Sequence, residues 1–296
     1  MSAPDARSAR PLRGTLLVLI SAACFGTTLI FTQRAMTGGA TLLQLLSYRY
    51  VFGAVMLCAV AGGIGAVQSV GVRKWRLLTL GGLAQAAVAG LSVASLQFIP
   101  AASVAFLFYT YPTWVAVLAI VRRTEHVDGA KIAALVLSLA GIVTIVGNPL
   151  ATKLDPRGIA LALAAAVVYA LLIPWLGKIQ EGLKPAAATT WIALGAAICF
   201  VLGALLTQTP LFPVSQPLLI NAVALALIPT TLAFTTFLAG LAALGPVRTS
   251  IVSTVEPFWT ALLAGLVLGQ DVGPRTWIGG AMIAAAMLVL QRKPKS

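Results

Sequence analysis

Apolar segments of about 20 residues recur along the whole chain, and this repetition constrains the fold more than any other feature of the sequence. A helix rises about 1.5 Å per residue, so each segment can cross a hydrocarbon core about 30 Å thick. Only 9% of the 296 residues are charged, against about 25% in an ordinary soluble domain. We therefore predict an all-α membrane protein with ten transmembrane helices. The expected spans are 13–33, 42–62, 76–97, 99–121, 129–147, 157–178, 186–206, 217–240, 246–268 and 274–291.

Lys and Arg residues are distributed unevenly between the two sides that these spans define. Placing alternate connections on opposite sides puts 15 of the 20 basic residues on the side of both termini and four on the other, while Arg49 lies inside a span. This bias follows the positive-inside rule and predicts that both termini are cytoplasmic. Since topology accounts for most of the net charge of +13, we expect no nucleic-acid partner.

Residues that build metal, disulfide or nucleotide sites are scattered or missing from the sequence. Cys24, Cys58 and Cys199 all lie within predicted spans, so neither a disulfide framework nor a metal site is expected. The single histidine, His126, lies in the charged loop RRTEHVD, where a solvated role is favoured over a proton relay. No Walker-type Gly-rich loop or catalytic set is found, so we expect no cofactor, no ATP-driven step and no enzyme.

An internal repeat divides the chain into two similar parts. RGTLLVLISAACFG (13–26) matches RGIALALAAAVVYA (157–170) at an offset of 144, and YPTWVAVLAIVRRTEHV (111–127) matches EPFWTALLAGLVLGQDV (256–272) at an offset of 145. We interpret the matches as a duplication that gives two five-helix halves, 1–148 and 149–296, of one integral membrane domain. Because five is odd, the second half enters the membrane from the opposite side. Inverted repeats of this kind place their substrate site near the midplane between the halves.

Three features together resemble the EamA branch of the drug/metabolite transporter superfamily. They are the five plus five spans, the Pro-containing fourth and ninth spans (Pro112 to Glu125, and Glu256-Pro257 to Gln270), and the Gly-rich last span WIGGAMIAAAMLVL. The resemblance covers essentially the whole chain, and within the branch it extends to the YddG-type amino-acid exporters. It implies a secondary transporter of the bacterial inner membrane. Gln270 departs from the Glu that the family often has there, which puts in doubt any mechanism that needs a carboxylate at this place.

Four spans have polar or helix-breaking residues near their midpoints. A proline within a helix removes a hydrogen bond, and the freed carbonyl groups are tolerated in lipid only against protein or a wet cavity. We therefore predict a central cavity. The alternative is structural, since proline is common in membrane helices, Thr can bond its own backbone and Gln can join helices. The midpoint residues are Gln85 in the third span, Thr110 and Tyr111 in the fourth, Pro229, Thr230 and Thr231 in the eighth, and Glu256 and Pro257 in the ninth.

Two charged residues lie within predicted spans, Arg49 in the second and Glu256 in the ninth. A charge at the bilayer centre costs about 2.5–3.5 kcal/mol on insertion scales, so both should face the interior and have partners. The two residues are the obvious pair, as a substrate site or as a purely structural salt bridge. Neither has a charged equivalent in the other half, where Arg49 corresponds to Ala193 and Glu256 to Tyr111. A zwitterionic amino acid would suit one cation and one anion at this depth.

Pairs of glycines occur in the third and tenth spans, at Gly81-Gly82 and Gly279-Gly280. A position without a side chain lets a neighbouring helix backbone approach closely. We therefore expect close helix packing at both pairs.

Aromatic residues complete the predicted site, because a substrate ammonium group is attracted to ring faces. Trp175 and Arg34 are expected near the outer boundary, where an aromatic belt is the simpler explanation. The predicted gating residues are Pro112, Pro229 and Pro257. The predicted substrate-binding residues are Arg49, Gln85, Tyr109, Tyr111, Tyr169, Trp175, Thr230, Thr231 and Glu256.

The expected function is export of amino acids or related small amphipathic metabolites by alternating access, with the third, fourth, eighth and ninth helices moving and the fifth and tenth supporting them. A drug, sugar or nucleotide-sugar carrier of the same superfamily is the alternative. A phosphate-bearing substrate would need several Lys or Arg residues within the membrane, and Arg49 is alone there. The missing catalytic set and soluble domain weigh against a membrane enzyme or a receptor. We expect a monomer or weak dimer in the lipid bilayer.

Overall fold

The computed structural model of the protein describes residues 6–99, 101–147, 154–269 and 272–291, and every regular element in these ranges is a helix. Within them, nine helical segments are long and apolar enough to cross a membrane. The tenth predicted span coincides with helix α16 (Pro274–Gln291), whose apolar part, Pro274–Leu290, is shorter than the others. The prediction of an all-α membrane protein is confirmed, and the count of ten crossings remains a prediction.

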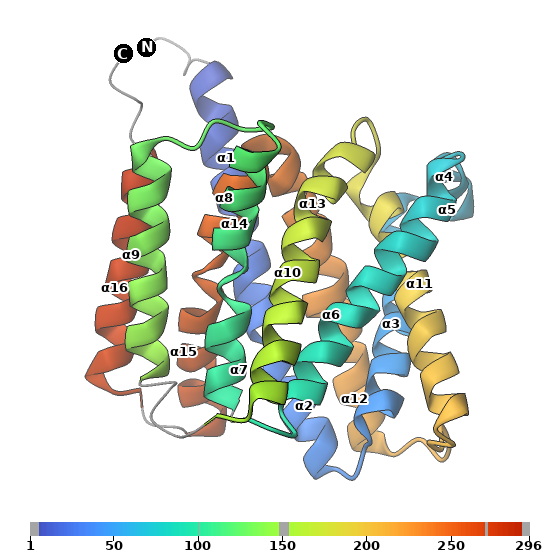
Figure 1. The fold of residues 1–296 in the computed structure, drawn as a ribbon. Helices are drawn as coiled ribbons and strands as arrows, with labels where there is room; N and C mark the ends of the chain where they lie inside the picture. The colour runs from blue at the N-terminus through green and yellow to red at the C-terminus, as the bar shows by residue number, and fades with distance from the viewer. Residues whose placement is uncertain (1–5, 100, 148–153, 270–271, 292–296) are drawn as a thin grey trace.

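Several crossings are built from consecutive helices rather than from one continuous helix (Figure 1). In the first half, α3 and α9 are continuous, and a short helix, α4, lies in a connection. The elements of this half are α1 (Ala6–Gly26), α2 (Thr28–Thr37), α3 (Leu42–Ala61), α4 (Ile64–Gln68), α5 (Arg73–Arg76), the π-helix η1 (Leu77–Gly81), α6 (Gly82–Ser95), α7 (Ala101–Phe108), α8 (Tyr111–Val121) and α9 (Gly129–Val146).

The second half repeats this plan with two interrupted crossings, the eighth and the ninth. Its first two crossings, α10 and α11, are continuous helices. The elements before α16 are α10 (Pro156–Ile179), α11 (Pro185–Leu206), α12 (Gln216–Leu225), the π-helix η2 (Ala226–Leu232), α13 (Ala233–Leu244), α14 (Pro246–Ser253) and α15 (Glu256–Leu268).

Polar side chains cap the first turns of several helices. Asp128 accepts a hydrogen bond from the Lys131 backbone amide at the start of α9, at 2.9 Å. Asp155 accepts one from the Arg157 amide at the start of α10, at 2.8 Å, and its carboxylate also pairs with the Arg157 guanidinium group at 2.7 Å. These contacts with Arg157 hold the pKa of Asp155 below its usual value. Each cap satisfies backbone amides that the helix itself leaves unpaired.

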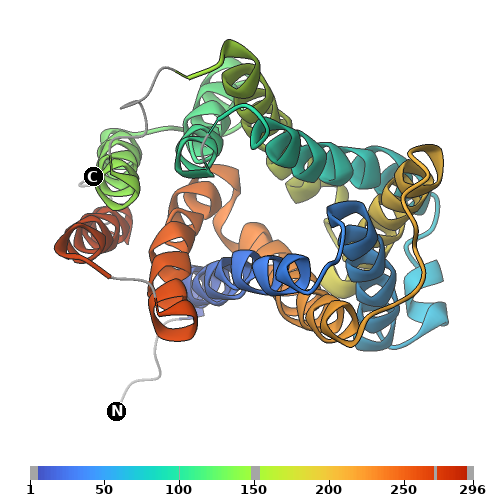
Figure 2. The same ribbon diagram turned by 90° about the horizontal axis from the view of Figure 1, so that it is seen from below.

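The main helix pairs each join one helix from the first half to one from the second. α3 packs on α11, α9 on α16, α1 on α13, and α6 on α10. If each helix is replaced by its counterpart in the other half, the α1–α13 pair becomes the α10–α6 pair. The α3–α11 and α9–α16 pairs stay the same, because each joins two counterparts. In Figure 1, α1 and α9 run from the upper face to the lower one, whereas α10 and α16 run upward. Corresponding helices therefore run in opposite directions. Figure 2 shows α9 and α16 side by side at one edge.

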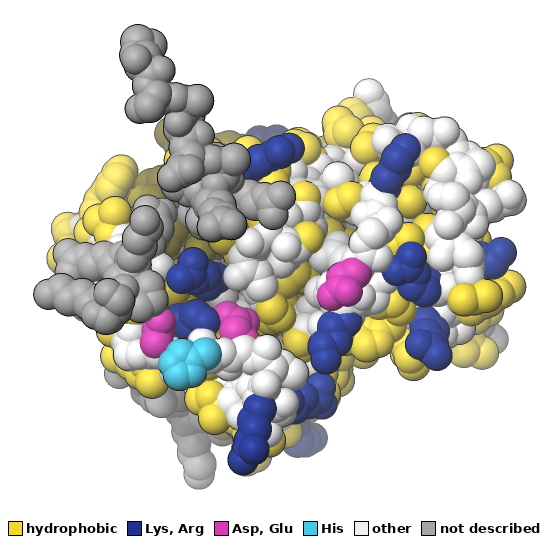
Figure 3. Space-filling model, turned by 90° about the horizontal axis from the view of Figure 1, so that it is seen from above, with side chains coloured by type: hydrophobic (Ala, Val, Ile, Leu, Met, Phe, Trp, Pro, Cys, Tyr) yellow, Lys and Arg dark blue, Asp and Glu magenta, His cyan; other side chains and the backbone are white. Residues whose placement is uncertain are grey.

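One face of the molecule carries most of the described basic residues. α1 starts and α16 ends on this face, which is uppermost in Figure 1. Figure 3 shows Lys and Arg side chains spread over it. We call it the basic face and predict that it is cytoplasmic. Its residues include Arg73, Lys74, Arg76, Arg122, Arg123, Lys178 and Lys184.

Glycines allow two pairs of helices to approach closely. A Cβ atom on Gly82 of α6 would lie 2.5 Å from the Gly195 Cα atom of α11. A Cβ atom on Gly279 of α16 would lie 2.5 Å from the Gly141 carbonyl oxygen of α9. Real Cβ atoms do not approach other atoms this closely, so both contacts require glycine. The predicted close packing is confirmed at Gly82 and Gly279.

Candidate functional site

The fourth and ninth crossings are interrupted at matching positions near the middle of each crossing. In the fourth, α7 ends at Phe108 and α8 begins at Tyr111; in the ninth, α14 ends at Ser253 and α15 begins at Glu256. Pro112 and Pro257 stand in the first turns of α8 and α15. Proline is tolerated there because its missing N–H group would have no helical partner. Both breaks are two residues long and lie 145 positions apart in the sequence. The two prolines, Pro112 and Pro257, are separated by the same number of residues.

The third and eighth crossings each contain a π-helical segment. In η2, Pro229 has no N–H group to donate, and the Thr231 hydroxyl donates to the Ala226 carbonyl oxygen at 2.8 Å. The Thr231 hydroxyl thus bonds the backbone of its own helix, as expected for a structural role and not for substrate binding. In the third crossing, η1 has the same widened geometry without a proline. Segments of this kind are frequent at functional sites.

Glu256 lies at the centre of a cluster of tyrosines. Its carboxyl group is within hydrogen-bonding reach of the Tyr109 side chain and interacts electrostatically with Tyr111 and Tyr169. The rings of Tyr111 and Tyr169 meet edge to face with centroids 4.8 Å apart. Tyr111 also contacts the Ser253 hydroxyl group across the two interrupted crossings. Four of the predicted site residues are therefore brought together, Tyr109 from the break between α7 and α8 and the others from α8, α10 and α15. Glu256 remains half-buried within this cluster.

Arg49 belongs to a second polar cluster, on α3 and η2. Its Nε atom donates to the Thr230 hydroxyl at 2.9 Å, and its guanidinium carbon lies 5.2 Å from the centroid of the Tyr50 ring. Arg49 and Glu256 form no direct ion pair in the part of the chain that the structure describes, although Arg49 acts on Glu256 electrostatically. A direct Arg49–Glu256 salt bridge, which was the structural alternative, is thus not formed among the described residues, because the guanidinium group of Arg49 lies against Thr230 and Tyr50.

Gln85 of α6 joins this second cluster through Tyr50. Its amide nitrogen donates to the Tyr50 hydroxyl at 3.0 Å. The Gln85 side-chain oxygen is buried and has no hydrogen-bond partner among the described residues. Reversing the amide would only exchange the unpaired atom, since one end would still face no partner. Buried polar groups of proteins are normally paired, so an unpaired amide that bonds Tyr50, the neighbour of Arg49 in the chain, marks a position where a ligand can bind.

Trp175 lies elsewhere from its predicted position. It stands near the end of α10 on the basic face, one turn before Lys178, and not at the outer boundary. The expectation was wrong because α10 runs toward the basic face, so its last turns lie there. Arg34, near the end of α2, is on the opposite face as expected. Gln270 lies outside the described residues.

Several residues of the two clusters did not emerge from the sequence patterns. Tyr50 follows Arg49 directly, and adjacent positions on a helix point about 100° apart, so a contact between them was not expected. Phe108, Phe25 and Phe237 surround the tyrosines as well, and the Phe108 and Tyr169 rings stack with centroids 5.6 Å apart. The offset of the repeat was the available signal, because it aligns Phe25 with Tyr169.

No group of His, Cys, Asp and Glu side chains in the described ranges could hold a metal ion. The site therefore offers one carboxylate, one guanidinium group, an amide and several phenol rings. Such a set can bind a small polar molecule with aromatic or apolar parts.

Comparisons with known proteins agree with this architecture. The EamA-like transporter family matches the chain twice, over residues 12–147 and 156–292. The uncharacterized inner membrane transporter YicL of Salmonella typhimurium strain LT2 is 26% identical over 289 residues, covering 94% of this chain and 95% of the relative. An uncharacterized transporter of Archaeoglobus fulgidus is 26% identical over 281 residues, covering 95% and 97%.

A solved crystal structure superposes on the protein with a TM-score of 0.80 and 20% sequence identity, covering 96% of this chain and 99% of that one. At this identity the likeness shows a shared fold. The apolar crossings and the inner-membrane relative identify a multi-pass protein of the bacterial inner membrane. Since the family matches both halves and almost the whole chain, the protein belongs to the EamA-like transporter family and is a membrane transporter.

Proposed function

We propose that the protein is a secondary transporter that exports amino acids or related small amphipathic metabolites by alternating access. The observation that carries this proposal is the separation of Glu256 from Arg49. Both charges lie within the membrane crossings, yet neither neutralises the other by direct contact in the described structure. A zwitterion between them would offer its ammonium group to Glu256 and its carboxylate to Arg49. The tyrosine rings around Glu256 would pack against the apolar part and attract the ammonium group.

The interrupted crossings support a moving site. The breaks before Pro112 and Pro257 and the π-helix around Pro229 lack regular backbone bonds, so these positions are suited to act as hinges. The third, fourth, eighth and ninth crossings would rock around the substrate. The fifth and tenth, α9 and α16, pack on each other at the edge and would support them. Halves 1–148 and 149–296 would act as the two inverted units.

A drug, sugar or nucleotide-sugar carrier is the alternative within the family. Tyrosine rings and the Gln85 amide would also suit a sugar ring. A nucleotide sugar would need several cations in the membrane interior, and among the described crossings Arg49 is the buried cation of the central region. The YddG-type resemblance supports the amino-acid assignment.

Purified protein in liposomes tests the proposal. A panel of labelled amino acids and sugars is measured at two opposite pH gradients, with movement scored in both directions. We expect uptake of amino acids, and a dependence on the pH gradient would distinguish proton coupling from facilitated diffusion. A correctly folded protein that moves sugars and no amino acids would support the alternative, and one that moves neither would contradict transport of both classes.

The unpaired amide of Gln85 gives a separate prediction. Replacing Gln85 by Leu should weaken binding of the transported amino acid about tenfold, because the substrate loses one hydrogen bond and Tyr50 loses its partner. Equilibrium binding of the labelled substrate to purified protein measures the effect. Gln44→Leu is the matched control, since the Gln44 amide is also buried but bonds the carbonyl oxygens of Leu211 and Pro213. Equal losses in both variants would indicate a general structural effect.

A further inference from the structure

A pocket of about 850 Å³ opens at the basic face, between the ends of α8, α10 and α13. Its inner wall includes Val115 of α8, Trp175 of α10 and Leu241 of α13. This volume is within the range of about 300–1,000 Å³ that is typical of small-molecule sites. Glu256 and Arg49 do not line it. The two clusters around Glu256 and Arg49 together form what we call the central site. The pocket is thus distinct from the central site, and we call it the basic-face pocket.

The basic-face pocket and the tyrosine cluster are stacked along the same three helices. Val115 lies four residues after Tyr111 on α8, and Leu241 lies four residues after Phe237 on α13. On α10, the pocket residue Pro174 follows Tyr169 by five. All three helices run toward the basic face, so each pocket residue lies about one turn, or about 6 Å, above an aromatic residue.

The aromatic residues below the pocket form a continuous layer, which we call the aromatic layer and define as Tyr111, Tyr169, Phe237 and Phe25. Centroid distances are 4.8 Å between Tyr111 and Tyr169, 6.4 Å between Tyr169 and Phe237, and 6.5 Å between Phe237 and Phe25. Tyr111 and Phe237 are only 1% and 2% exposed, whereas Tyr169 and Phe25 are half-buried. In the ninth crossing, Glu256 lies ten residues beyond the pocket residue Pro246, about 15 Å along a helix. The layer therefore lies between the pocket and Glu256.

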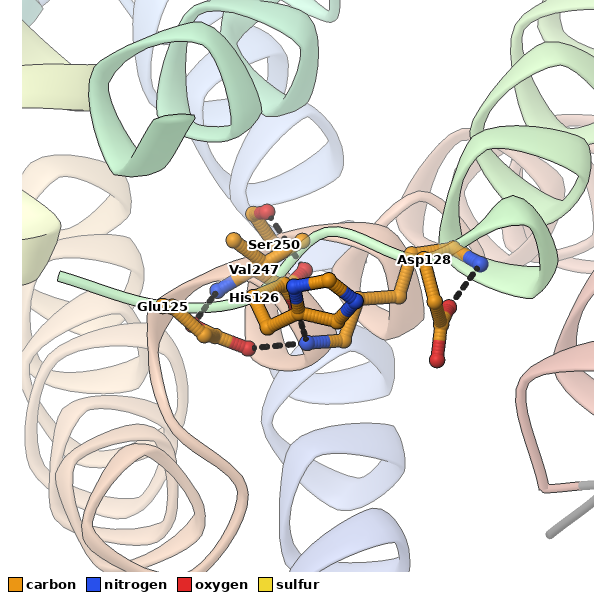
Figure 4. Close-up of polar contacts among 6 residues, drawn as sticks. Glu125, His126, Asp128, Val247 and Ser250 are labelled. Carbon is orange, nitrogen blue, oxygen red and sulfur yellow. Dashed lines mark hydrogen bonds and ion pairs between the residues drawn. The ribbon is translucent and has the colours of Figure 1, made fainter. Parts of the chain in front are cut away.

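A charged contact between the two halves fixes one wall of the pocket (Figure 4). The Glu125 carboxylate accepts a hydrogen bond from the Val247 backbone amide, at 3.3 Å, and pairs with the Lys131 ammonium group at 2.7 Å. Glu125 belongs to the connection between α8 and α9, and Val247 to the first turn of α14. Because the Glu125 charge is already balanced by Lys131, this residue shapes the wall without supplying a free charge.

Free charges of both signs remain at the rim. Arg122, Lys178 and Glu181 line the pocket, are exposed, and form no ion pair within the described part of the chain. Trp175 and Gln180 line the pocket as well. Cations, a carboxylate and an aromatic surface around one cavity suit the same amphipathic zwitterions that the central site would take.

We propose that the basic-face pocket is a loading site, where an amphipathic zwitterion binds from the basic face before it passes the aromatic layer to Glu256. The assignment of the ligand rests on the proposed function. The separation of the pocket from Glu256 by the aromatic layer does not rest on it, and is tested on its own.

Cysteine labelling tests the separation without any substrate. Single cysteines replace Ala242, an exposed pocket residue, or Thr260, one turn beyond Glu256, in a protein whose three native cysteines are changed to Ala. Behind a closed layer, Thr260→Cys reacts only through an open state populated about 10% or less, so a membrane-impermeant maleimide added at the basic face should modify Ala242→Cys about tenfold faster. Equal rates at the two positions would overturn the separation.

Binding of radiolabelled phenylalanine tests the loading role. We expect two bound molecules per wild-type protein, and one each in Glu256→Gln and in Ala242→Trp, which places a large side chain in the pocket. Transport from the basic face by Ala242→Trp should fall about fivefold, while Val136→Trp, on the exposed side of α9, stays at the wild-type rate.

The outcomes separate this inference from the proposed function. A wild-type protein that transports phenylalanine but binds one molecule, or an Ala242→Trp variant that matches Val136→Trp, overturns the loading site alone. A wild-type protein that neither binds nor transports any labelled amino acid overturns the proposed function together with the ligand assigned to the pocket.

Discussion

Replacing Glu256 by Gln should lower amino-acid transport about 30-fold or more while the protein still assembles in the membrane. The bound substrate would bury its ammonium group against Glu256, and removing one member of such a buried charge pair costs about 2 kcal/mol or more, where each 1.36 kcal/mol corresponds to a factor of ten. Gln keeps the size of the side chain and can still bond Tyr109, so folding should be preserved. The loss would fall on the substrate ammonium group. Initial transport rates in proteoliposomes, at matched protein density, measure the effect.

The control for this variant is Asp155→Asn, which removes a carboxylate at the membrane surface. Asp155 caps α10 and pairs with Arg157 far from the tyrosine cluster, and Asn is also a good capping residue. We expect wild-type transport from it. Unchanged uptake and efflux in Glu256→Gln would assign Glu256 a structural role only, and would leave the proposed binding of the ammonium group without support.

Replacing Gly195 by Ala should strongly destabilise the protein although it adds only one methyl group. The new Cβ atom would overlap the Leu78 carbonyl oxygen and would lie 2.9 Å from the Gly82 Cα atom. These are backbone atoms that cannot turn aside, so α11 and the third crossing must separate. Overpacking of this kind costs about 1–3 kcal/mol or more. We expect the melting temperature of the purified protein to fall by about 5 °C or more.

A glycine with free space around it provides the matched control. Gly90 lies in α6, on the same crossing as Gly82, and a Cβ atom there would meet no atom within 4 Å. Since Ala is favoured over Gly in helices by about 0.5–1 kcal/mol, Gly90→Ala should leave stability unchanged or raise it slightly. Similar melting temperatures for the two variants would contradict the close α11 packing described here.

The positions of the helix breaks could be predicted from sequence, because a proline disturbs the helix at its own position and the repeat marks two such prolines at matching places. Pro112 and Pro257 stand at the same offset as the matched segments, and both breaks occur just before them. The cluster of Tyr109, Tyr111 and Glu256 follows, because these residues lie in or beside the breaks. Residues next to a break at the midplane must meet other residues at that depth.

Contacts that depend on packing could not be predicted in this way. Arg49 was expected to pair with Glu256, but α3 approaches η2 so closely that a Cβ atom on Gly53 would lie 2.7 Å from the Thr230 side chain. This approach brings the Thr230 hydroxyl to Arg49. The π-helix η1 contains no proline, so no residue type marked it. Counting residues along the third span put Gln85 near its midpoint, and Gln85 lies in α6. Its hydrogen bond to Tyr50 could not be predicted, because it depends on how α3 and α6 pack together.

The pairing of α3 with α11 and of α9 with α16 limits what either half could do alone. A polypeptide of five crossings would present the faces of these helices to lipid instead of to a partner. Two identical copies could satisfy them only if one were inserted upside down relative to the other. A half expressed on its own would therefore need dual topology, with each molecule free to enter the bilayer either way, to form the same helix pairs.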